Sequence, residues 1–147
     1  VYMGFGMFNA RRNAQGFSHD EMADAIAYCR ARDVKTNITL NILAGDRELE
    51  DALEDAKFLY EAGADALIVT GLQTGSAPTL DEVREMKSLA HGRPVLIGSG
   101  IKDSTIAGYL SVADGVIVGS SIKKDGNVWN AVDAQRVRRL VDSAQGK

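Results

Sequence analysis

Five short apolar segments alternate with stretches of helical periodicity along the chain, and this alternation limits the fold more than any other feature. Successive segments start 22 to 35 residues apart, close to the length of a strand, helix and strand unit. The last three are apolar on both faces, as expected of parallel strands covered on each side. The sequence therefore predicts a single α/β domain over residues 1–147 with five βα units and a parallel sheet. The strands are expected at Val1–Phe5, Thr36–Ile42, Ala66–Thr70, Pro94–Gly98 and Val116–Gly119.

The helix boundaries are marked by local signals. Ser18–Glu21 and Thr79–Glu82 have the spacing of a capping box, in which the side chains of the first and fourth residues bond each other's backbone amides. Asp33, Gly63 and Gly92 stand where helices end in a left-handed residue. These signals predict helices that begin after Ser18 and Thr79 and end before the three left-handed positions.

The number of strands shapes the predicted architecture. A complete TIM barrel has eight strands in roughly 250 residues, whereas this chain has 147 residues and five strand signals. We therefore expect a TIM-barrel-derived fragment. Two arrangements satisfy its open edges: an open, flavodoxin-like sheet with helices on both faces, or a barrel-like sheet completed by homo-oligomerisation.

Charge and composition limit the partners and the location. The formal net charge is −3, which favours neither nucleic acid nor an anionic membrane. One cysteine allows no internal disulfide, and no apolar run approaches the ~18 residues of a membrane span. We expect a cytoplasmic protein. Because Val1 stands first, inside an apolar segment, we also expect an engineered chain, with recombination in nature as the alternative origin.

The first part of the chain resembles one protein family. Val1–Ala14, Phe17–Glu21 and Thr36–Leu43 are similar to the barrel domain of the U32 peptidase family from its second strand onward. The resemblance covers residues 1–69.

The second part resembles another family. Val69–Gly75, Pro94–Ile101, Ala113–Gly126 and Trp129–Asn130 are similar to the C-terminal part of the BtpA family, over residues 66–145. That family is similar to phosphate-binding TIM barrels and is associated with photosystem I biogenesis. The two resemblances together imply a chimera, with a U32-like segment at 1–69, a BtpA-like segment at 70–147 and a junction within Ala66–Val69.

Two glycine–serine loops are the candidate binding site. Each follows a predicted strand and precedes a helical stretch, where open backbone amides and the helix N-terminus favour an anion. In the BtpA-like resemblance they match the loops after strands seven and eight, which frequently bind phosphate in TIM barrels. We predict that they bind phosphate, sulfate or a phosphorylated small molecule; alternatively, the glycines only make tight turns. The residues are Gly98, Ser99, Gly100, Gly119, Ser120 and Ser121.

Other polar residues have simpler interpretations. Exposed positions are expected for Lys123 and Lys124 and for Arg136, Arg138 and Arg139, while Trp129 is expected to pack between the last strand and helix. A retained catalytic role is not expected for the residues that follow the first two strands, which are Asn9, Arg11, Arg12, Asn41 and Asp46. We predict no metal site and no cofactor, because metal-ligand spacings and nucleotide-binding fingerprints are missing from the sequence.

Three functions remain open. The sequence favours a chimeric scaffold without catalysis that keeps an anion-binding corner. The alternatives are a TIM-barrel-type enzyme acting on a phosphorylated metabolite and a BtpA-like assembly protein. The length of the chain disfavours the enzyme alternative, because TIM-barrel enzymes take their catalytic residues from the ends of strands all around a closed barrel.

Overall fold

The computed structural model of the chain describes residues 2–8, 18–41, 48–71 and 75–146. In these ranges five strands form one parallel sheet in the order β1-β2-β3-β4-β5. The predicted number and direction of the strands are confirmed, and their ends shift by a few residues. The strands are β1 (Tyr2–Phe8), β2 (Lys35–Asn41), β3 (Ala66–Thr70), β4 (Val95–Gly98) and β5 (Gly115–Ile117).

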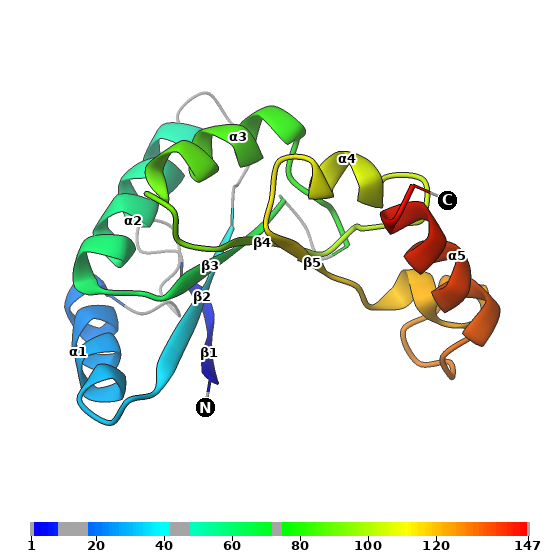
Figure 1. The fold of residues 1–147 in the computed structure, drawn as a ribbon. Helices are drawn as coiled ribbons and strands as arrows, with labels where there is room; N and C mark the ends of the chain where they lie inside the picture. The colour runs from blue at the N-terminus through cyan, green and yellow to red at the C-terminus, as the bar shows by residue number, and fades with distance from the viewer. Residues whose placement is uncertain (1, 9–17, 42–47, 72–74, 147) are drawn as a thin grey trace.

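The helices follow the strands along one side of the sheet. Figure 1 shows four of them succeeding one another around the outer face, with the fifth beyond β5. Right-handed connections between sequential neighbours place every helix on the same face. The order is therefore that of a barrel arc, and the predicted flavodoxin-like alternative with helices on both faces is wrong. The helices are α1 (His19–Arg30), α2 (Glu48–Ala62), α3 (Leu80–Leu89), α4 (Ile106–Leu110) and α5 (Ala134–Ala144), with single 3-10 turns at η1 (Ser120–Ile122) and η2 (Lys124–Gly126).

Both predicted capping boxes are present. The Glu21 amide donates to the Ser18 hydroxyl oxygen while the Glu21 carboxylate accepts from the Ser18 amide, and Thr79 and Glu82 repeat the exchange. Asp33 has a φ of 54°, in the left-handed region predicted for it. The local sequence signals at these helix ends are confirmed.

The two faces of the sheet differ in their cover. Alternate residues of neighbouring strands align in rows, so Ile38, Leu67 and Val95 face the helices and are fully buried. The neighbouring row toward the other face, Ile68 and Leu96, is only half-buried. A closed barrel would enclose this second face, whereas the described residues leave it without helical cover.

Candidate anion-binding site

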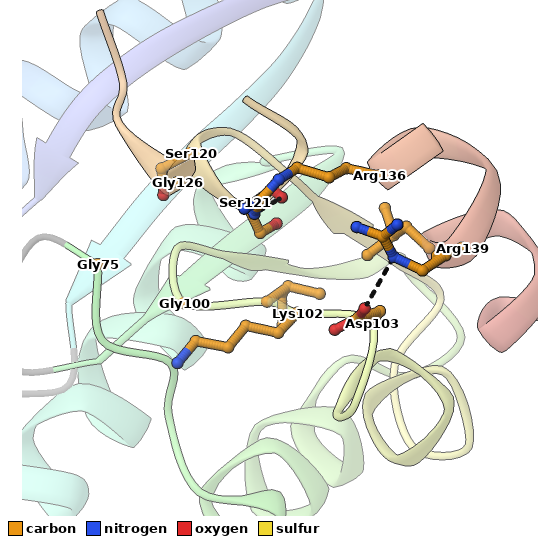
Figure 2. A pocket seen from close by; sticks show the side chains of 11 residues that line it. Gly75, Gly100, Lys102, Asp103, Ser120, Ser121, Gly126, Arg136 and Arg139 are labelled. Carbon is orange, nitrogen blue, oxygen red and sulfur yellow. Dashed lines mark hydrogen bonds and ion pairs between the residues drawn. The ribbon is translucent and has the colours of Figure 1, made fainter. Parts of the chain in front are cut away.

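The two predicted loops meet in one pocket beyond the carboxyl ends of β4 and β5. Gly100, Ser120 and Ser121 line this pocket, which has a volume of about 230 Å³ and is named the loop pocket here. Figure 2 shows the loop after β4 on one side and the 3-10 turn after β5 on the other. Half of the six predicted residues are thus brought together, and Gly98, Ser99 and Gly119 do not line the pocket.

Gly98 has a packing role instead. A Cβ at this position would lie 2.8 Å from Thr70 Cγ2 and 2.9 Å from Ile68 Cγ2, too close for a carbon atom. Gly100 combines a φ of 70° with a close approach to the backbone of the facing loop, since a Cβ would lie 2.4 Å from Ala77 N. Gly98 therefore packs within the sheet against side chains of β3, which is neither the predicted anion contact nor the tight turn of the alternative interpretation.

The expected helix N-termini do not provide the positive charge. α4 begins at Ile106, well after Gly100, and a three-residue turn follows β5. The cations instead come from side chains, because Lys102, Arg136 and Arg139 also line the loop pocket. The positive charge at the loop pocket therefore comes from side chains and not from helix N-termini, and anion binding there stays a prediction.

Arg136 and Arg139 reach the pocket from the first two turns of α5. The amides of Gln135 and Arg136 donate to Asp133 Oδ1 at 2.8 and 3.3 Å, which fixes the start of the helix. Donation from these amides, from Arg136 first, holds the pKa of Asp133 below its usual value. Arg136 Nη1 then donates to the Ser121 carbonyl at 3.4 Å.

The prediction of a solvated face is wrong for Arg136, which is half-buried, and is confirmed for Arg139, whose side chain is 55% exposed although it also lines the loop pocket. Arg138, which lies between them, is exposed and does not line the pocket. One signal was available in the sequence: Arg136 stands four residues before Leu140, so both lie on the same side of the helix, and Leu140 is buried.

A buried hydroxyl group in the pocket lacks a partner. Ser121 Oγ is enclosed and makes no hydrogen bond within the described part of the chain. Buried polar atoms are usually hydrogen-bonded, because an unpaired one costs about 1–3 kcal/mol. The first amides of a 3-10 turn also have no partner inside the turn. The pocket therefore offers hydrogen-bonding groups as well as positive charge.

The other candidate residues lie elsewhere. Lys123 and Lys124 do not line the pocket. Trp129 is 91% exposed, so its expected packing against the last strand and helix is wrong. Of the residues that follow the first two strands, Asn9, Arg11, Arg12 and Asp46 and the side chain of Asn41 lie outside the described residues.

The described ranges contain neither a cluster of metal-ligating side chains nor a helix that could span a membrane. Residues 2–8, 18–41, 48–71 and 75–146 contain no group of three or more His, Cys, Asp and Glu residues that could hold a metal ion. Within the same ranges, each helix is too short or too polar to cross a membrane.

Solved structures show the same arrangement of strands and helices. CutC from Streptococcus agalactiae matches with a TM-score of 0.67 and 15% identity over 97% of this chain and 73% of that chain. The dihydrodipicolinate synthase of Acinetobacter baumannii matches with a TM-score of 0.57 and 17% identity over 97% and 49%. At this identity the likeness shows the fold, which is a TIM-barrel-derived arc.

Two curated relatives are similar in sequence. The photosystem I biogenesis protein BtpA of Synechocystis is 40% identical over 80 residues, which are 54% of this chain and 28% of that protein. An uncharacterised protein of Archaeoglobus fulgidus is 34% identical over 141 residues, which are 95% of this chain and 55% of that protein. The chain thus spans about half the length, or less, of these relatives.

One family accounts for most of the chain. The model of the BtpA family matches residues 14–146 and passes through Ala66–Val69, where we expected a junction. The comparisons therefore give no support to a U32-like segment, a chimera or an engineered origin, and the similarity to BtpA extends well before residue 66. From residue 14 to residue 146 this chain belongs to the BtpA family.

Proposed function

We propose that the loop pocket binds phosphate, sulfate or a phosphorylated small molecule. The observation that carries this proposal is that two loops and two arginines line one pocket together with Ser121, whose buried hydroxyl has no hydrogen-bond partner among the described residues. An anion at this place would accept hydrogen bonds from Ser121 Oγ and from the open amides of the turn. It would also partly neutralise the guanidinium groups of Arg136 and Arg139, which line the pocket from α5.

The charge balance favours an anion. Lys102, Arg136 and Arg139 carry three positive charges against one negative charge on Asp103. The side chain of Arg139 is 55% exposed, so solvent screens much of its attraction. We expect a free inorganic anion to bind weakly, with a Kd of about 1 mM, equivalent to ~4 kcal/mol.

The volume limits the size of the ligand. About 230 Å³ is slightly below the ~300–1,000 Å³ of typical small-molecule sites. The pocket therefore suits a small phosphorylated metabolite better than a dinucleotide. We propose binding and assign no reaction to the pocket.

Nuclear magnetic resonance titration with inorganic phosphate tests the proposal. We expect the amides of Gly100, Ser120 and Ser121 to shift together and to saturate in the millimolar range. Arg136→Ala should weaken binding about 5- to 30-fold, because a hydrogen bond to a charged group contributes about 1–2 kcal/mol at a partly exposed site. Shifts that appear elsewhere, or nowhere, contradict the proposal.

Arg138→Ala is the matched control. It removes the same charge from the same helix, but Arg138 does not line the pocket. We expect it to change the Kd less than twofold through long-range electrostatics. If the two variants weaken binding equally, the effect comes from net charge and the pocket is not the site.

An exposed apolar segment supports a second candidate function, the binding of an assembly partner. Val128, Trp129 and Val132 are 57%, 91% and 53% exposed within five residues. Exposed apolar clusters of this kind frequently mark protein interfaces. The Synechocystis relative is a photosystem I biogenesis protein, so photosystem I subunits are the partners to test. Trp129→Ala should reduce their capture, and unchanged capture rejects this function.

A further inference from the structure

Among the described residues that line the loop pocket, one carries a negative charge that would repel an anion. Asp103 is the acidic residue among the described residues that line the pocket. Its Oδ1 accepts from the Ser104 amide at 2.9 Å, and its Oδ2 lies 3.8 Å from Arg139 Nε, which is longer than a hydrogen bond. Oδ2 therefore keeps its capacity to accept a hydrogen bond. Because a carboxylate repels phosphate, Asp103 weakens a site for inorganic phosphate alone.

The Asp103 carboxylate contributes little to the stability of the fold. The N-cap of α4 is Thr105, which makes no side-chain cap hydrogen bond, so Asp103 does not cap the helix. The Asp103 and Arg139 side chains are 51% and 55% exposed, and an ion pair between such groups contributes little to stability. Figure 2 shows the Asp103 carboxylate beside Arg139 at the pocket. It is available to a ligand.

The pocket also has room for more than a phosphate group. Its volume of about 230 Å³ exceeds that of several water molecules at ~30 Å³ each, while phosphate has only five heavy atoms. Ile101 and Leu140, both nearly buried, supply apolar surface at its wall. A carbon skeleton attached to the phosphate would occupy this space.

We propose that the loop pocket takes a phosphate monoester of a polyol, and that Asp103 selects it by accepting a hydrogen bond from a hydroxyl group. The inference rests on the proposed phosphate binding and names its ligand class. The phosphate lies with Arg136 and Ser121, and the hydroxyl donates to Oδ2. Hydrogen bonds to a charged acceptor are roughly twice as strong as neutral ones. An ammonium group would also suit a carboxylate, but Lys102, Arg136 and Arg139 repel a further cation.

Calorimetric titration with three ligands tests this selection. Glycerol 3-phosphate carries hydroxyls, propyl phosphate has the same carbon number without them, and inorganic phosphate has no carbon. The unchanged protein should prefer glycerol 3-phosphate to propyl phosphate about fivefold, equivalent to ~1 kcal/mol. Asp103→Ala should abolish this preference and bind propyl phosphate at least as tightly as before, because a repelling charge is gone. Asp103→Asn keeps an acceptor and should retain part of the preference.

The outcomes separate this inference from the function on which it rests. If phosphate does not shift the pocket amides, both are rejected. If phosphate binds while the preference is missing, or survives in Asp103→Ala and Asp103→Asn, only the selection by Asp103 is rejected. Tighter binding of phosphoethanolamine than of glycerol 3-phosphate would reassign the carboxylate to an ammonium group. Asp142→Asn, which removes an exposed charge of α5 outside the pocket, should leave the preference unchanged.

Discussion

Replacement of Asp65 by asparagine should destabilise the sheet in a way that depends on pH. Asp65 stands just before β3 and accepts from the amide of Thr36 in β2 at 2.8 Å, while Lys35 Nζ lies 3.2 Å from its other oxygen. Thr36 is fully buried, so this bond fixes the start of β2 beside β3. Asparagine keeps an acceptor for the amide but loses the charge.

The expected loss follows from these contacts. Hydrogen bonds to charged groups contribute about 1.5–3 kcal/mol and neutral ones about 0.5–1.5. Because the Asp65 side chain is 26% exposed, we expect a loss near the low end, about 1 kcal/mol at pH 7. With an unfolding entropy of about 2.1 cal/mol/K per residue, this chain of 147 residues should lose about 3 °C in Tm.

The pH dependence identifies the cause. Burial raises the pKa of Asp65, but the hydrogen bonds from Thr36 and Lys35 together outweigh burial and hold the pKa below its ordinary 3.8. A lowered pKa in the folded state stabilises the protein above the unfolded value, and this stabilisation is lost as the pH falls through the folded pKa. The difference between Asp65→Asn and the unchanged protein should therefore be full at pH 7 and shrink toward pH 3.

Thermal unfolding followed by circular dichroism at pH 7, 5 and 3 measures this difference. Asp81→Asn is the control, because Asp81 is 85% exposed and pairs only with Arg84 on the surface of α3 among the described residues. It should change the Tm by less than about 1 °C. An equal loss for Asp65→Asn at pH 7 and pH 3, or no loss at pH 7, would refute the role assigned to the carboxylate.

Three further outcomes are expected. Gly98→Ala should lower the free energy of unfolding in urea by about 1–3 kcal/mol, because the new Cβ would overlap side chains of β3. Gly108→Ala within α4 should raise it by up to about 1 kcal/mol, because the nearest atom lies 3.8 Å away and alanine favours the helix. Equal effects would contradict this packing. Thr79→Ala should cost about 1 kcal/mol by removing the capping box of α3, and an unchanged urea midpoint would refute it. The chain should self-associate at high concentration, because the described residues leave one face of the sheet without helical cover and give β1 and β5 only one neighbouring strand each. A monodisperse monomer in light scattering excludes this.

Local interactions made much of the fold predictable. A capping box such as Thr79–Glu82 closes within four residues, so its spacing alone specifies a helix start. The left-handed conformation of Asp33 follows from its place at the end of α1. The apolar runs of β3 and β4 likewise identify strands buried on the face toward the helices.

The candidate site was predictable only in part. The loops after β4 and β5 could be placed at one edge, because parallel strands bring their carboxyl ends together. Which loop residues face the pocket could not be derived, since Gly98 packs on Thr70 across the sheet while Gly100 and Ser121 turn toward α5. That difference depends on contacts between residues far apart in the chain.

The sequence by itself determined the alternating elements, their parallel direction and most of their ends, because these follow from periodicity and from contacts within a few residues. Only the tertiary structure decided the strand order, the position of Arg136 and Arg139 at the loop pocket and the exposure of Trp129. The same amphipathic helix can present its arginines to solvent or to a loop, and the same tryptophan can be buried or exposed. What packs against each of them is set by the whole arrangement of helices around the sheet.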